Sequence, residues 1–253
     1  MSEDLEQRLK REIESYEGGL ERERYNDVLS HCGFFSDKKR LEIIKNIVQH
    51  GNGGKLLELG STLWYTWVEK NSVVPTVLEC INISDRELEE GKKIANISKL
   101  KPNFQIMDAH DLKFPEKSFD VVFGGAILHH LEYEKALQQV QKILKADGKF
   151  VFVEPLRLNP VAMIVRALTP KARTEDEKPL ALAELKLLDK YFNTKLHYEQ
   201  FLAVPVGVLS RFLFKSPDNV FNRMAFNLDN LLVKLLPPIG VFYRSIVITG
   251  TPK

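Results

Sequence analysis

The sequence predicts an α/β protein built on a doubly wound, mostly parallel sheet. From residue 55 to residue 153, short apolar runs that have the length of buried strands alternate with longer segments of helical periodicity, a pattern typical of such sheets. Helices of this length connect parallel strands by right-handed crossovers. The composition agrees with a globular domain, because 44% of the residues are hydrophobic and 28% are charged.

The expected elements follow one another in a regular order. Helices are expected near the N-terminus, with an apolar spacing of four at residues 5–13 and an apolar stripe at residues 41–48 that ends before the glycine-rich break at 51–54. Seven strands are then expected at 55–59, 76–83, 104–107, 119–123, 149–153, 196–204 and 245–249, with helices at 85–95, 133–144 and 181–192.

Along the chain, this order predicts four segments. Residues 1–50 form an N-terminal helical segment, 51–155 a Rossmann-like core, 156–244 substrate-side insertions and a helical cap interleaved with a late strand, and 245–253 the final strand. The net charge is +2, yet residues 195–253 carry seven basic and three acidic residues and eight of the 24 aromatic residues. This basic, aromatic end is expected to be a helical cap with its own core, or a lid over an apolar substrate whose basic residues meet an anionic group or a membrane surface.

Several classes of function are disfavoured by composition. No apolar run approaches the roughly 20 residues that cross a bilayer, and the charged N-terminus lacks the apolar stretch of a secretory signal. Cys32 and Cys80 are too far apart for a C-x-x-C motif and predict no disulfide framework, so a cytoplasmic location is expected. A net charge of +2 is too small for a protein that neutralises many nucleic-acid phosphates. The oligomeric state is left open.

Four segments then resemble one family in order and spacing. The segments are KLLELGS at 55–61, INISDRELEEGKKIA at 81–95, FQIMDAHDLKFPEKSFDVVFGGAILHHL at 104–131 and ALQQVQKILKADGKFVFVEP at 136–155. Together they resemble the class I S-adenosylmethionine-dependent methyltransferases, especially the small-molecule branch that includes the quinone C-methyltransferases. The resemblance covers about residues 53–155 and implies a Rossmann-like methyltransferase fold, S-adenosyl-L-methionine as cofactor and a small-molecule substrate.

In such a sheet the ligand binds beyond the carboxyl ends of the strands. After the first strand, Gly60 can take a positive φ, Ser61 follows it, and Glu58 can accept a hydrogen bond from the ligand's ammonium group. The plainer interpretation is a strand-ending glycine beside a solvent-facing glutamate. The resemblance implies glycines at two further loop positions, but this chain has Thr62 and Trp64 there, which would require a rebuilt loop or a differently placed cofactor.

Further cofactor contacts are expected after the next three strands. The resemblance places Asn82, followed by Ile83, at the ribose hydroxyls, and Glu79 is the competing ribose ligand. Asp108 and Ala109 correspond to the adenine site, although Asp108 could simply cap a helix. Gly124 and Gly125 end the fourth strand. Asp120, at the start of that strand, is expected to be structural.

His129 and His130 are the candidate catalytic residues. A histidine side chain can accept a proton at neutral pH, so either ring could act as general base, or it could be a packing residue. No metal site is expected, because adjacent histidines on a helix diverge and no ligand partner has the required spacing. The resemblance implies in-line transfer of a methyl group to an O, N or C atom of a small, hydrophobic or aromatic metabolite. The alternative is a cofactor-binding, non-methylating member or partner subunit of the same fold.

Overall fold

The computed structural model describes residues 27–168 and 178–253. The helix expected at residues 5–13 therefore lies outside the described residues. Contacts group the chain into two compact units that are both discontinuous in sequence. The first unit comprises Met1–Lys39, Pro155–Ala181 and Tyr198–Ile246, and the second comprises Arg40–Glu154, Leu182–His197 and Val247–Lys253. The four segments expected from the sequence follow chain order, whereas contacts gather three stretches of chain into each unit.

The second unit is built on a seven-stranded sheet with the strand order β3-β2-β1-β4-β5-β7-β6. The strands are β1 (Lys55–Leu59), β2 (Val77–Asn82), β3 (Asn103–Ile106), β4 (Phe119–Gly125), β5 (Leu144–Pro155), β6 (Phe192–Glu199) and β7 (Ser245–Pro252). The first five strands pair in parallel. The order reverses between β1 and β4, which makes their carboxyl ends the expected ligand-binding edge. The predicted fold class is confirmed.

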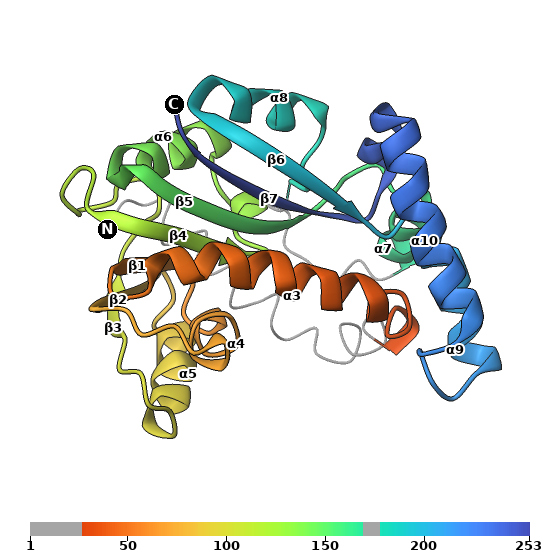
Figure 1. Ribbon diagram of the computed structural model, residues 1–253, viewed down its shortest axis with the longest axis horizontal. Helices are drawn as coiled ribbons and strands as arrows, with labels where there is room; N and C mark the ends of the chain where they lie inside the picture. Colours follow the sequence, from red (N-terminus) through yellow and green to blue (C-terminus); the bar gives the residue numbers. More distant parts are fainter. Residues whose placement is uncertain (1–26, 169–177) are drawn as a thin grey trace. The chain divides into compact units, whose positions relative to one another are not determined.

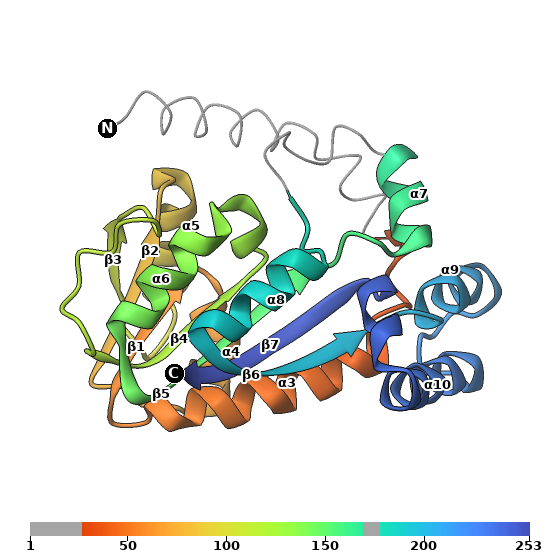
Figure 2. The same ribbon diagram turned by 90° about the horizontal axis from the view of Figure 1, so that it is seen from above.

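The helices that accompany the sheet match the expected ones, with one addition. They are α3 (Phe34–Val48), α4 (Leu63–Trp67), α5 (Asp85–Asn96), α6 (Tyr133–Ile143) and α8 (Leu182–Tyr191). Helices α6 and α8 pack side by side (Figures 1 and 2). The short α4, which immediately follows β1, was not predicted. No helix of residues 27–168 and 178–253 is both long and apolar enough to cross a bilayer.

Central strands β1 and β4 read as continuous apolar runs because they are buried on both faces. Leu56, Val121 and Phe123 are fully buried and share a core cluster with Trp64 from α4. At the start of β4, Asp120 accepts hydrogen bonds from the backbone N–H of Lys55 at 2.8 Å and from Lys145 Nζ at 2.7 Å. Asp120 thus ties the beginning of β4 to that of β1, in line with the structural role expected for it.

The first unit contains α7 (Pro160–Leu168), α9 (Ala203–Leu213) and α10 (Val220–Leu235). Helices α9 and α10 lie side by side (Figure 2). The expectation of a strand at 196–204 is wrong at both ends, since β6 is Phe192–Glu199 and α9 begins at Ala203. The buried carboxylate of Asp229 accepts hydrogen bonds from the backbone N–H groups of residues 201, 202 and 203 at 2.7–3.1 Å. This bonding starts a helix within an apolar run that has no helical cap of its own.

Gly91 on α5 supports the loop after β1 by having no side chain. A Cβ atom at this position would lie 2.2 Å from the backbone oxygen of Ser61 and 2.6 Å from Phe104 Cε1. The helix can approach the loop this closely only with glycine at position 91.

We expect Gly91→Ala to lower the free energy of unfolding by about 1–2 kcal/mol. Alanine normally favours a helix over glycine by roughly 0.5–1 kcal/mol, so a net loss means that overpacking against Ser61 outweighs this gain. Urea unfolding followed by circular dichroism measures the change. Asn96→Ala, at an exposed position of the same helix, is the control and should shift stability by less than about 0.5 kcal/mol. A stabilised Gly91→Ala protein would contradict the steric argument.

Candidate cofactor and acceptor site

The predicted site residues follow the carboxyl ends of four neighbouring parallel strands. Gly60 follows β1, Asn82 is the last residue of β2, Asp108 comes two residues after β3, and Gly125 ends β4. The strand ends are also bonded to one another: the N–H of Gly60 donates to the backbone oxygen of Ile81 at 2.9 Å, and the N–H of Met107 donates to that of Asn82 at 3.1 Å. The residues singled out by the sequence therefore share one edge of the sheet.

Glu58 holds the loop after β1. Its fully buried carboxylate accepts hydrogen bonds from the backbone N–H groups of Thr62 at 3.0 Å, Leu63 at 2.8 Å and Trp64 at 2.9 Å. Both carboxylate oxygens of Glu58 thus accept hydrogen bonds from the loop backbone. Glu58 is not the solvent-facing glutamate of the plainer interpretation, and its carboxylate satisfies the N–H groups that begin α4.

The loop is rebuilt around Thr62 and Trp64. The ring of Trp64 is fully buried in the core, 6.5 Å from the ring of Phe104, and its Nε1–H donates to the backbone oxygen of Ser61 at 3.1 Å. Ser61 is buried, and its hydroxyl donates to the backbone oxygen of Glu87 at 2.8 Å. Gly60 has a φ of +134°, as the sequence predicted, a conformation that side chains disfavour. The indole of Trp64 therefore fills the core and not the space above the loop.

Electrostatics around Glu58 are dominated by burial. Burial raises the pKa of Glu58 to about 7, even though the three backbone N–H groups oppose the shift. The thiol of Cys80 lies 3.7 Å from Glu58 Oε2. Burial and the neighbouring carboxylate raise the pKa of Cys80 well above the usual thiol range, so this cysteine is an inert, protonated core residue at neutral pH.

Asn82 and Glu79 occupy different places on β2. Asn82 is partly exposed at the end of the strand, and its Oδ1 accepts a hydrogen bond from the N–H of Ser84 at 3.1 Å. Glu79 lies in mid-strand, where its carboxylate accepts from Asn103 Nδ2 at 3.1 Å and Gln105 Nε2 at 2.8 Å. Only Asn82 of the two competing ribose ligands is at the edge where β2 ends, and Ile83 follows it.

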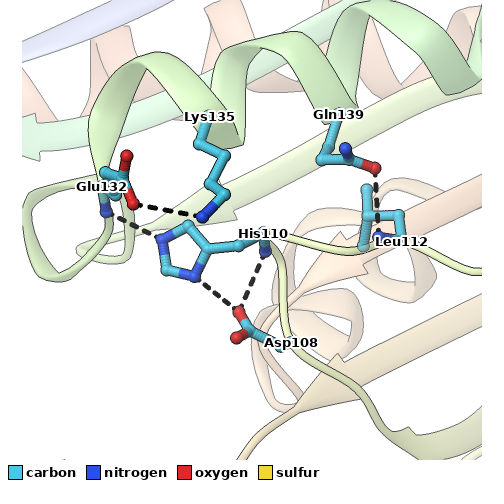
Figure 3. Close-up of polar contacts among 6 residues, drawn as sticks. All are labelled: Asp108, His110, Leu112, Glu132, Lys135 and Gln139. Atoms are coloured by element: carbon cyan, nitrogen blue, oxygen red, sulfur yellow. Dashed lines mark hydrogen bonds and ion pairs between the residues drawn. The ribbon is translucent and has the colours of Figure 1, made fainter. Parts of the chain in front are cut away.

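Asp108 is bound to a histidine whose tautomer is fixed (Figure 3). The N–H of Glu132, at the start of α6, donates to His110 Nε2 at 2.8 Å, so the neutral ring carries its proton on Nδ1. Nδ1–H faces Asp108 Oδ1 at 2.7 Å, and the backbone N–H of His110 donates to the same oxygen at 2.9 Å. Asp108 thus forms an Asx-type turn and caps no helix. Ala109, between them, is buried, and a third of the Asp108 side chain is exposed.

Gly124 and Gly125 bring the end of β4 close to the rest of the edge. A Cβ atom on Gly124 would lie 2.9 Å from the backbone oxygen of Leu59, and one on Gly125 would lie 2.9 Å from Leu63 Cδ1. The next residue, Ala126, has a φ of +53°, a conformation that costs a non-glycine residue energy. The chain therefore turns sharply between β4 and the histidine pair.

His129 is joined to a buried carboxylate. Its Nδ1 lies 2.8 Å from Glu154 Oε2, and both side chains are buried. Glu154 Oε1 also accepts from the N–H groups of Ile127 at 3.0 Å and Leu128 at 2.9 Å, which fixes the turn that carries the histidines. With Nδ1–H directed at the carboxylate, the lone pair of a neutral His129 ring is on Nε2. The ring of His130 lies against that of His129, with 4.1 Å between centroids and an angle of 40° between the ring planes, and it is the more exposed of the two.

Sequence reasoning did not single out Glu154. The available signal was an acidic residue at the end of the apolar run 150–153, at the carboxyl end of the fifth parallel strand. For metals the described residues give no candidate, since within residues 27–168 and 178–253 no three His, Cys, Asp or Glu side chains gather closely enough to hold an ion.

A doubly wound sheet with this set of residues at its carboxyl edge defines the class of Rossmann-like proteins that bind a nucleotide-containing cofactor. A comparison with known protein families gives a more specific result. Residues 60–152 match the family Methyltransf_11, described as a methyltransferase domain. This stretch is therefore similar to class I S-adenosylmethionine-dependent methyltransferases that act on small molecules, in agreement with the resemblance in the sequence.

Individual relatives match over shorter stretches. A sarcosine/dimethylglycine N-methyltransferase of Aphanothece halophytica is 29% identical over 83 residues, which are 32% of this chain and 30% of that protein. The methyltransferase YcgJ of Bacillus subtilis strain 168 is 31% identical over 109 residues, 40% of each chain. The chain thus covers less than half of the length of these two relatives.

A solved structure resembles the whole fold more broadly. The geranyl diphosphate C-methyltransferase of Streptomyces coelicolor A3(2), determined with Mg²⁺, geranyl diphosphate and S-adenosyl-L-homocysteine, superposes with a TM-score of 0.58 at 10% identity. The superposition covers 85% of this chain and 77% of that one. At 10% sequence identity, the superposition shows that the two chains share a fold.

The raised pKa of Glu58 predicts how stability changes with pH. Between pH 4.5, the usual value for the unfolded chain, and about pH 7, the folded protein holds a proton on Glu58 that the unfolded chain has released. The free energy of unfolding should therefore fall as pH rises through this window, by up to about 1.4 kcal/mol per pH unit, and level off above it.

Urea unfolding of the protein and of Glu58→Gln across this range isolates the contribution of Glu58. The difference in unfolding free energy between the two proteins should change with pH in the window and be constant above about pH 8. A difference that does not vary with pH would show that the carboxyl group titrates normally.

Proposed function

We propose that this protein transfers a methyl group from S-adenosylmethionine to an O, N or C atom of a small, hydrophobic or aromatic molecule. The observation that carries the proposal is the gathering of the expected cofactor residues at the edge where the strand order reverses, together with a histidine held by a buried carboxylate. The A. halophytica relative is named as an N-methyltransferase and the S. coelicolor structure as a C-methyltransferase. The class of reaction is shared, and the acceptor atom differs.

The side chains at this edge suit S-adenosylmethionine. The partly exposed amide of Asn82 can bond to ribose hydroxyls, and the partly exposed carboxylate of Asp108 can accept from the exocyclic amine of adenine. Ile83 and Ala109 would flank the base, while Gly60, with its positive φ, would let the backbone approach the ligand closely, and Ser61, Gly124 and Gly125 would line the same edge. In this proposal Glu58 holds the loop and does not touch the ligand, because its oxygens already accept three backbone N–H groups.

When bound, the cofactor supplies an activated methyl group on a sulfonium sulfur. The chain itself has to orient the acceptor and, for an O–H or N–H acceptor, remove a proton. His129 is suited to that step, because its Nε2 can accept a proton while Glu154 keeps the ring oriented and stabilises the resulting imidazolium. His130, which lies against His129 and is more exposed, would shape the acceptor's position. No step requires a metal ion.

One observation favours a second candidate function. The residues at the two later glycine positions of the family pattern, Thr62 and Trp64, belong to a rebuilt loop whose N–H groups bond to Glu58. A loop of this kind would also suit a member of the fold that binds the cofactor without methylating a substrate, for example as the partner subunit of an active enzyme. Binding and turnover separate the two candidates.

Asn82→Ala and Asp108→Ala should each weaken binding of S-adenosylhomocysteine by about tenfold, because one hydrogen bond to a ligand contributes on the order of 1–1.5 kcal/mol. Isothermal titration calorimetry measures the affinity. Glu79→Gln discriminates between the two ribose candidates and should leave affinity unchanged, and the exposed Lys113→Ala is the control. If the unsubstituted protein binds neither cofactor nor product at submillimolar concentration, both candidate functions fail.

His129→Ala should lower turnover by about 10²–10⁴-fold while cofactor binding is retained, because it removes a general base. A labelled-methyl transfer screen over phenols, quinones, amines and carboxylic acids provides the substrate and the assay. His130→Ala should lower turnover with cofactor binding likewise retained. Unchanged turnover in both variants would eliminate the general-base proposal.

Glu154→Gln tests the positioning role separately. Loss of the carboxylate removes the partner that orients the ring of His129, so kcat should fall by at least about tenfold while the affinity for S-adenosylhomocysteine is retained. A variant that is merely less stable would lose cofactor binding together with turnover.

A further inference from the structure

Helix α10 exposes large apolar side chains on its outward face. Its buried residues are Asn222, Ala225 and Asp229, at 3–4% exposure. Its outward residues include Val220, Met224 and Leu235, at 55–65% exposure. A helix of a soluble protein normally buries its apolar stripe and exposes its polar face. Here Phe226, Leu232 and Val233 are partly buried, and a further set of large apolar side chains faces outward.

Helix α9 likewise exposes large apolar side chains. It buries the small residues Ala203, Val204, Gly207 and Ser210 and exposes large ones, with Leu209 at 62%, Phe212 at 75% and Leu213 at 73%. We name the outward residues Leu209, Phe212, Leu213, Val220, Met224 and Leu235 the hairpin patch. Twelve of the 21 exposed large hydrophobic residues in the described part of the chain lie between residues 209 and 242, so the apolar surface is concentrated here, beyond what scattered surface residues produce.

Hydrogen bonds fix the two helices in this orientation. The hydroxyl of Ser210, on the inner face of α9, bonds to His31 Nδ1 at 3.0 Å, Asn219 Nδ2 at 2.8 Å and Asn222 Nδ2 at 3.0 Å. Asp229, on the inner face of α10, accepts the N–H groups that begin α9. Turning either helix to bury its apolar face would break several of these buried bonds, each of which is costly to leave unmade. The outward apolar surface is thus built into the fold.

Basic residues border the patch. Lys215 is in the turn between the helices, and Arg223 and Lys234 are 11 residues apart on α10, which places them along the same side of its apolar stripe. All three are exposed. An apolar helical face edged by lysine and arginine is the pattern of helices that lie in the interface of a bilayer, where the basic groups meet anionic headgroups and their methylenes cover apolar surface. A second copy of the chain packed on the patch with its α10 antiparallel would set these like charges against each other.

We propose that the α9–α10 hairpin is a peripheral membrane anchor that inserts the hairpin patch into the headgroup region of bilayers containing anionic phospholipid. The contact concerns the first unit alone and needs neither cofactor nor catalysis, so it stands or falls separately from the proposed methyl transfer. An apolar acceptor dissolved in the bilayer would be concentrated at the same surface.

Vesicle flotation of the full chain tests the proposal. The protein should float with phosphatidylcholine vesicles that contain about 30% phosphatidylglycerol, should float weakly with pure phosphatidylcholine, and should be released in part by about 0.5 M salt. The double variant Phe212→Glu, Leu213→Glu should reduce the bound fraction at least about tenfold, because it replaces buried apolar area with charge. Ile97→Glu, an equally exposed apolar position of the second unit at 82% exposure, is the matched control and should bind like the unsubstituted protein.

Hydrogen exchange of the full chain with and without anionic vesicles locates the contact. Amides of residues 203–236 should exchange more slowly when vesicles are present. The proposal is overturned if the protein does not float, if the double variant floats as well as the Ile97→Glu control, or if the hairpin is already protected without vesicles. If the hairpin is already protected, analytical ultracentrifugation identifies what covers it. A dimer would point to a second copy of the chain, and a monomer to another segment of the same chain. Urea unfolding of the double variant verifies that it is folded.

Discussion

Buried carboxylates at two strand ends hold the candidate site in shape. Glu58 near the end of β1 accepts the N–H groups that begin α4, and Glu154 near the end of β5 accepts those of the turn before His129. In each case a charge-bearing side chain is removed from water and satisfied by backbone donors, which is the condition under which a buried carboxylate is tolerated. Asp229 uses the same device in the first unit. The loops that would face the ligand are therefore held in position by the buried carboxylates of Glu58 and Glu154. These two side chains need not touch the ligand themselves.

This arrangement explains how the loop after β1 can depart from the glycine-rich family pattern. In the family pattern, glycines at the two later loop positions let the backbone pass close to a ligand, and the loop there forms no helical turn. Here Glu58 and the buried indole of Trp64 stabilise a short helix in the same place, and Gly91 allows α5 to pack against it. Thr62 and Trp64 therefore fit the rebuilt loop, because each of them has its own hydrogen bond or core contact.

Much of the fold could be predicted because it depends on local pattern. Apolar runs separated by helical periodicity located each of the seven strands at least in part. The rule that ligands bind beyond strand ends pointed to the segments in which the family resemblance assigned Asn82 and Asp108. What could not be predicted depends on partners distant in sequence. The strand expected at 196–204 ends at Glu199 because Asp229, far along the chain, starts a helix at residues 201–203. Glu154 was missed because only the folded chain shows its carboxylate beside His129.

His110 illustrates how a backbone contact can control a side chain's orientation. Nε2 accepts the N–H of Glu132 and Nδ1 faces Asp108, so both ring nitrogens are held by partners on different segments of the chain. The imidazole therefore connects the start of α6 to the end of β3 and fixes the direction in which the Asp108 carboxylate points. A ligand approaching this corner of the sheet would meet an acceptor whose position is set by the residue at the start of a distant helix as well as by its own loop.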